Sequence, residues 1–183
     1  MAKKPNRNSP ATAEQCAEAH QAGVSEGTAE GLAIYLTVMR DKFGKSTEAA
    51  YTIYQRTVYE CDAIKLDGHI IARYERELRE LRELIKCDIC PQMKNIAKAY
   101  KQPKQPIKVK DVEYSGRQGR AAGWQFATMV FLLAIRKEWK YTKTQLLRVY
   151  AAACETRESI REKYINVPDL ESVLLEEGKI KVV

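Results

Sequence analysis

Apolar positions along the chain recur every three to four residues, which is the spacing of amphipathic α-helices. The clearest run covers residues 32–43 and ends at Gly44, a residue typical of helix C-termini. A second run, 47–64, begins with a hydroxyl residue suited to an N-cap. A third helix is expected over 69–90, before a proline, and a short one over 13–22. The first half of the chain is therefore predicted to be helical.

The middle of the chain loses this helical pattern. Residues 102–116 contain two prolines, which disfavour a helix. Ile107, Val109 and Val112 stand there among lysines in a pattern that indicates a short edge strand. The segment is therefore predicted to be an extended linker.

Helical periodicity returns over residues 117–139. Thr142 and Gln145 then have the spacing of a capping box, which predicts a helix over 143–163. A short final helix is expected over 169–177, just after a proline and just before a glycine. The second half therefore repeats the order of helices and short turns found in the first.

The two halves match when the chain is shifted by 96 residues without gaps. The shift pairs two glycines four residues apart, an arginine, a capping hydroxyl and several large apolar residues. The pairs include Gly23 with Gly119, Gly27 with Gly123, Leu36 with Leu132, Arg40 with Arg136, Ser46 with Thr142 and Tyr54 with Tyr150. Two amphipathic helices match at some apolar positions by chance, but chance does not account for the glycines or the arginine. We interpret the pattern as a duplication of one helical unit.

The predicted fold is all-α: two tandem three-helix units that form a pseudo-symmetric helical bundle, with a short extended linker. The expected divisions are a disordered basic tail with a possible short helix (1–21), a first helical unit (22–92), a basic proline-containing linker (93–116) and a second helical unit (117–183). Because a unit of about 60 residues has a marginal core of its own, the two are expected to pack together. The protein is then a monomer with pseudo-twofold symmetry or a homodimer.

The net charge of +7 is concentrated in two places, the first ten residues and the stretch 94–120. No apolar leader is found at the N-terminus, and no apolar run is long enough to span a bilayer. The five cysteines lack the spacing of a disulfide framework. A cytoplasmic protein that does not associate with a membrane is therefore expected.

No pattern typical of a catalytic centre is found, so a non-enzymatic protein without a cofactor is predicted. Cys87 and Cys90 have the spacing of a pair of zinc ligands, and Cys16 with His20 is the best source of two more. Two small apolar side chains on one helix face account better for the cysteine pair. We therefore predict no metal site.

The basic stretch is the strongest candidate for a macromolecule-binding surface. Its residues are Lys94, Lys98, Tyr100, Lys101, Lys104, Lys108, Lys110, Arg117 and Arg120. Such a stretch would contact phosphates independently of base sequence, whereas the alternative is a linker that its lysines keep solvated. A second candidate is a helix face with Arg73, Arg76, Arg79 and Arg82. Its alternating acids indicate a salt-bridged solvent face, on which a partner helix could also dock.

The second half of the chain resembles a known class of proteins. The residues that carry the resemblance are GWQFATMVFLLAI (123–135), YTKTQLLRVY (141–150) and NVPDLESVLLEE (166–177). Together they resemble small helical accessory proteins encoded by phages and prophages of Gram-positive bacteria. The resemblance implies a protein that binds something of the host. We expect it to bind and inhibit or redirect a host protein such as a nuclease or defence factor. The alternative is a sequence-nonspecific nucleic-acid-binding protein that uses the basic tail and linker.

Overall fold

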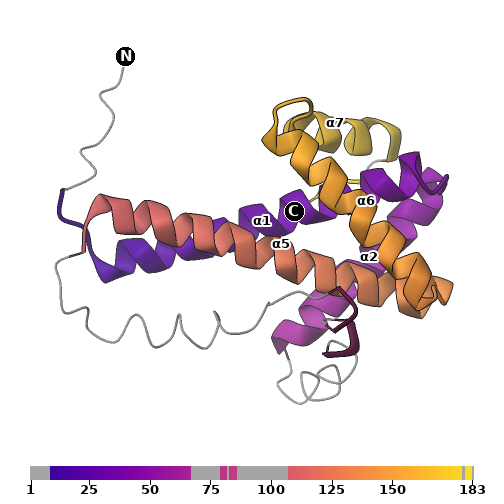
Figure 1. Cartoon of the computed structure of the whole chain (residues 1–183), viewed down its shortest axis with the longest axis horizontal. Coiled ribbons are helices and arrows are strands. Elements are labelled where there is room, and N and C mark those ends of the chain that lie inside the picture. The colour runs from indigo at the N-terminus through magenta and orange to yellow at the C-terminus, as the bar shows by residue number, and fades with distance from the viewer. Residues whose placement is uncertain (1–8, 67–78, 82, 86–106, 179, 183) are drawn as a thin grey trace. The chain divides into compact units, whose positions relative to one another are not determined.

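Five long helices account for most of the chain, as a computed structural model shows (Figure 1). The structure describes residues 9–66, 79–81, 83–85, 107–178 and 180–182. The long helices are α1 (Ala13–Asp41), α2 (Thr47–Leu66), α5 (Val109–Trp139), α6 (Lys143–Arg161) and α7 (Val167–Gly178). Residues 79–81 and 83–85 are also helical, and no described residue belongs to a strand. The prediction of an all-α fold is confirmed.

Short polar side chains fix where these helices begin. Thr12 and Gln15 form a reciprocal capping box at α1: each backbone N–H donates to the side chain of the other residue. Thr142 and Gln145 form the same box at α6, as the sequence predicts. At α2, the hydroxyl of Ser46 accepts from the N–H of Ala49. These contacts satisfy donors that have no partner inside the helix.

The chain divides into two compact units. Unit 1 comprises residues 1–28 and 88–125, and unit 2 comprises residues 29–87 and 126–183. Helices α1 and α5 each contribute their first part to unit 1 and the rest to unit 2. This division follows contacts in space, whereas the predicted limits at 22–92 and 117–183 follow the sequence repeat and stay a prediction.

In unit 1, glycines bring the first parts of α1 and α5 into backbone contact, side by side and parallel (Figure 1). A Cβ at Gly23 would overlap the carbonyl oxygen of Gly116, and one at Gly119 would overlap that of His20. The same holds for the pairs Gly27 with Arg120 and Gly123 with Val24. Any side chain at these glycines would force the two helices apart. Close approach of this kind favours Cα–H···O contacts between helices.

The core of unit 2 lies around the second parts of α1 and α5. Every residue of 32–39 and of 127–135 is buried, so both helices are covered on all sides there. The apolar faces of the later helices add Ile53 from α2, Val149 from α6 and other buried residues, among them Leu146, Ala153, Leu170 and Leu174. Helix α2 also contacts α7, and the Tyr54 hydroxyl donates to the carbonyl of Lys181 at 2.8 Å.

The expectation of an extended segment before the second half is wrong. Residues 109–116 of the predicted extended linker form the first two turns of α5, and the expected edge strand is reduced to one antiparallel bridge between Pro10 and Lys108. The physical reason is the packing of α5 on α1, since these turns end at Gly116, whose backbone contacts Gly23. The short helix predicted within the N-terminal tail is present, because residues 13–21 belong to α1.

A second difference concerns the first helices. The short helix at 13–22 and the longer one at 32–43 are a single helix, α1, because its two glycines lie at the contact with α5 and do not interrupt it. Most of the predicted third helix, 69–90, lies outside the described residues. In the described part of the chain, no helix combines the length and the apolar character needed to cross a bilayer.

Candidate binding faces

The predicted basic surface falls partly on α5. Lys94, Lys98, Tyr100, Lys101 and Lys104 lie outside the described residues. Lys108, Lys110, Arg117 and Arg120 are described, and all four belong to unit 1. Lys110, Arg117 and Arg120 belong to α5, so helix geometry sets their spacing, whereas Lys108 lies just before the helix in the bridge with Pro10.

Three side chains share one face of α5. Lys110, Tyr114 and Arg117 stand at positions i, i+4 and i+7, which lie above one another on a helix. All three are exposed, Tyr114 to 56%. None of them makes a hydrogen bond or ion pair in the structure of the described residues. Arg120 follows on the adjacent flank and is also exposed. We call Lys110, Tyr114, Arg117 and Arg120 the α5 basic face.

Acidic residues surround this face. Asp111 and Glu113 lie between its cations, and Asp111 has a structural task because its carboxylate accepts from the backbone N–H of Lys108 at 2.8 Å. The first part of α1 has no lysine or arginine, and it exposes Glu14, Glu18 and Glu26. Unit 1 therefore carries opposite charges on its two helices, although its backbone contact is formed by neutral small residues.

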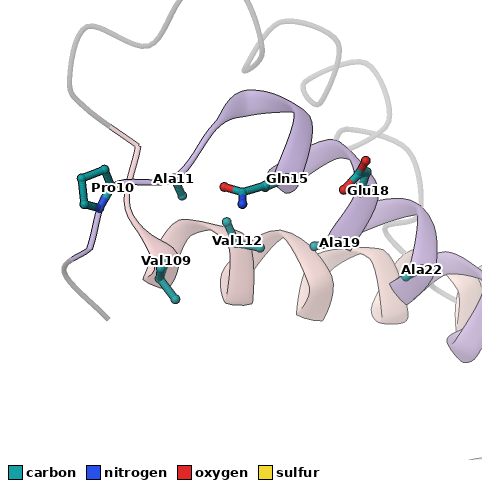
Figure 2. Close-up of a pocket in the computed structure, with 8 residues that line it drawn as sticks. All are labelled: Pro10, Ala11, Gln15, Glu18, Ala19, Ala22, Val109 and Val112. Atoms are coloured by element: carbon teal, nitrogen blue, oxygen red, sulfur yellow. The ribbon is translucent and has the colours of Figure 1, made fainter. Parts of the chain in front are cut away.

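An open groove of about 480 Å³ also lies in unit 1 (Figure 2). Its lining is mainly apolar, and Gln15 and Glu18 supply the polar side chains. The lining residues are Pro10, Ala11, Gln15, Glu18, Ala19, Ala22, Val109 and Val112. Nothing among these described residues forms a catalytic pair or a set of metal ligands.

Unit 2 contains a buried ionic cluster that the sequence pattern did not reveal. The side chain of Glu60 on α2 is wholly inaccessible. Its carboxylate pairs with Arg56 of the same helix at 2.8 Å and with Lys137 of α5 at 3.4 Å. The Arg56–Glu60 spacing, i and i+4, was the available signal, but a charged pair at that spacing is usually on the surface. Only the packing of α2 shows that this carboxylate is buried.

Arg56 is held in one orientation. Its Nη2 donates to Glu60, and its guanidinium lies 5.2 Å from the centre of the Tyr59 ring, a cation–π contact. Its Nε is buried and has no acceptor in the structure of the described residues. A buried donor left without an acceptor costs about 1–3 kcal/mol. The rest of the side chain stays accessible, with 39% of its surface exposed.

The remaining predicted sites, the arginine face and the cysteine pair, lie mostly outside the described residues. Of the arginine face, Arg79 is described and exposed, whereas Arg73, Arg76 and Arg82 lie outside the described residues. Cys87 and Cys90 lie outside them too. The described residues contain no group of three or more His, Cys, Asp or Glu side chains placed to hold a metal ion.

No protein-family model, curated protein or solved structure matches this chain.

Proposed function

We propose that the protein is a non-enzymatic binding protein of the phage or prophage accessory kind, which binds a host protein and inhibits or redirects it. The phage setting rests on the resemblance of residues 123–135, 141–150 and 166–177 described above. The binding role rests on the surface of α5.

The observation that carries the proposal is the α5 basic face. Lys110, Arg117 and Tyr114 are exposed on one side of a helix and have no partner among the described residues. Tyrosine and arginine are enriched where protein interfaces contribute most of their binding energy. A rigid helix presents such side chains at a lower entropic cost than a loop does.

The charge pattern of unit 1 favours a protein partner over a nucleic acid. A phosphate backbone that followed α5 would meet Asp111 and Glu113 between the cations, and Glu14 and Glu18 on the neighbouring helix. Like charges that face each other across an interface oppose binding. A protein surface with charges of both signs can complement this pattern.

The test is a capture experiment from a Gram-positive host lysate with the tagged full-length chain. We expect a stoichiometric protein partner, and we expect the Lys110→Ala/Arg117→Ala variant to lose it. The matched control is Lys143→Ala/Arg148→Ala, which removes two exposed cations from α6. Absence of a stoichiometric partner, or equal capture by the Lys110/Arg117 variant, would overturn the proposal.

A second candidate function is sequence-nonspecific binding of nucleic acid through the basic tail and linker. The observation in its favour is that the four lysines at 94–104 precede the α5 basic face without an intervening acid. Binding of this kind weakens steeply with salt. A gel shift with generic DNA and RNA at about 50 mM salt tests it, and the absence of any shift would eliminate it.

We also propose that the chain consists of two copies of one helical unit related by a pseudo-twofold axis. Three features recur 96 residues apart: the starts of the first helix (Ala13, Val109), the starts of the second helix (Thr47, Lys143), and a left-handed backbone conformation between them (Gly44, Lys140). The glycine contacts in unit 1 are reciprocal under the same shift. The contact of Gly23 with Gly116 corresponds to that of His20 with Gly119.

A further inference from the structure

The buried cluster of Glu60, Arg56 and Lys137 in unit 2 has a high free-energy cost for a group of residues that would serve only the stability of the fold. Removing a carboxylate from water is expensive, and well-packed neutral residues usually serve stability as well as a buried ion pair does. The proposed duplication supplies an internal comparison. The positions 96 residues after Arg56 and Glu60 are Ala152 and Thr156, both on α6. The second copy therefore lacks charges at these two positions, and its helix α6 instead pairs Arg157 with Glu30 of α1, a largely buried acid, at 3.5 Å.

From this contrast, we propose that Arg56 and Lys137, with the exposed tyrosines of α2, form a docking surface for an acidic segment of a partner protein. This inference rests on the proposed function, because it names the chemistry of a partner surface. The residues of this surface, the α2 docking face, are Tyr51, Gln55, Arg56, Tyr59 and Lys137.

The positions of the charges support this assignment. The carboxylate of Glu60 is covered, whereas Arg56 and Lys137 are 39% and 27% exposed, so an approaching partner meets the cations and not the acid. Both cations pair with the covered carboxylate of Glu60. Glu60 and the ring of Tyr59 orient the guanidinium in advance. A partner carboxylate would then bind without first ordering a flexible arginine.

The rest of the face suits a protein. Tyr51, Gln55 and Tyr59 stand at i, i+4 and i+8 on α2, and the two tyrosines are 41% and 61% exposed. Exposed tyrosines beside an oriented arginine are typical of the centres of protein interfaces. Two cations can neutralise few phosphates, and it is the number of neutralised phosphates that determines the affinity for a nucleic acid. The surface therefore fits carboxylates of a protein better than phosphates of a nucleic acid.

A direct binding experiment tests this proposal without the host partner. The full-length chain is titrated against a fluorescein-labelled decaglutamate peptide at about 50 mM salt, with fluorescence anisotropy as the readout. We expect the Arg56→Ala/Glu60→Thr variant, which copies Ala152 and Thr156, to weaken binding about tenfold or more, as expected for a lost charge-assisted contact. The matched control Lys143→Ala/Arg148→Ala removes two exposed cations from α6, outside both proposed faces, and is expected to change the affinity less than about threefold.

A second variant keeps the test decisive if the double variant does not fold. Tyr59 is 61% exposed, so Tyr59→Ala should leave the melting temperature unchanged and still weaken peptide binding. Unchanged binding in the folded variants, or no binding by the unmodified chain, would overturn the proposal. A labelled decathymidylate that binds more tightly than the peptide, with the same loss on Arg56→Ala/Glu60→Thr, would overturn it in favour of a nucleic acid. None of these outcomes affects capture of a host protein through the α5 basic face, so the two proposals fail separately.

Discussion

Tyr35 and Phe131 stack in the core of unit 2, with ring centroids 4.9 Å apart and ring planes inclined by 23°. Both side chains are fully buried, and they stand 96 residues apart on α1 and α5. The Tyr35 hydroxyl also donates to Thr128 Oγ1 at 3.2 Å. This stacked pair therefore joins the two helices that contribute most of the core.

Truncation of one ring tests the importance of this pair. Phe131→Ala should lower the free energy of unfolding by about 3–5 kcal/mol, because it leaves a cavity in a tightly packed region. Tyr35→Phe keeps the stacked rings and removes one hydrogen bond, so it should cost only about 1 kcal/mol. Denaturant unfolding followed by circular dichroism measures both. Equal losses of unfolding free energy in the two variants would show that the stacked rings are not the main contribution of this pair to stability.

The glycine contact in unit 1 predicts opposite effects for two glycine-to-alanine changes. Gly27→Ala places a methyl group against the backbone of Arg120, which cannot move aside, and should destabilise by about 1–3 kcal/mol. At Gly116 the nearest atom to an added Cβ is 3.6 Å away, so Gly116→Ala makes an ordinary contact. Alanine also has the higher helix propensity, by about 1 kcal/mol.

Gly116→Ala should therefore be neutral or stabilising. Thermal unfolding, together with amide hydrogen exchange of the first turns of α1 and α5, measures the difference. A stability loss at Gly116 as large as that at Gly27 would contradict the close packing of the helices.

The capping box of α6 predicts a loss of stability when its hydroxyl is removed. Thr142→Ala removes the hydroxyl that accepts from the Gln145 N–H, and should cost about 1 kcal/mol. Thr144, two residues further on, is exposed, and its side chain makes no hydrogen bond in the structure of the described residues. Thr144→Ala should therefore stay within about 0.5 kcal/mol of the unmodified protein in urea unfolding.

Buried and exposed ion pairs should differ in their effect on stability. Arg56→Met removes the ion pair of Arg56 with the buried Glu60 and should destabilise by about 2–4 kcal/mol. Lys42→Met breaks the pair with Glu155, whose side chains are 46% and 71% exposed, and should cost less than about 1 kcal/mol.

The double variant Arg56→Ala/Glu60→Thr removes the buried charge as well. It should recover most of the stability that Arg56→Met loses. Melting temperatures of the three variants measure this order, and a double variant less stable than Arg56→Met would refute the cost assigned to the buried carboxylate.

Local sequence signals determined much of the secondary structure. Thr142 and Gln145 predict the start of α6 because a capping box depends on residues three apart in sequence. The end of α5 at Trp139 and the short final helix follow equally from periodicity and from nearby prolines and glycines. These features need no information from distant parts of the chain.

The extended linker is the clearest prediction that failed. Val109 and Val112 alternate with lysines as in a strand, yet they belong to the first turn of α5. The helix packs there against α1, almost 100 residues earlier, through the backbone contacts of Gly116 with Gly23 and of Gly119 with His20. A local pattern of two valines does not contain that information, and the tertiary pairing overrides it.

For the candidate binding faces, the sequence by itself supplied the identities of the charged residues, and the tertiary structure supplied their surroundings. The basic character of Lys110 and Arg117 was evident, but only α5 places them on one face with Tyr114. The i and i+4 spacing of Arg56 and Glu60 was equally evident, but whether that pair lies in water or in the core depends on what packs against α2. Charge is a property of a residue and is read directly from the chain, whereas burial is a property of its neighbours and is decided only when the chain has folded.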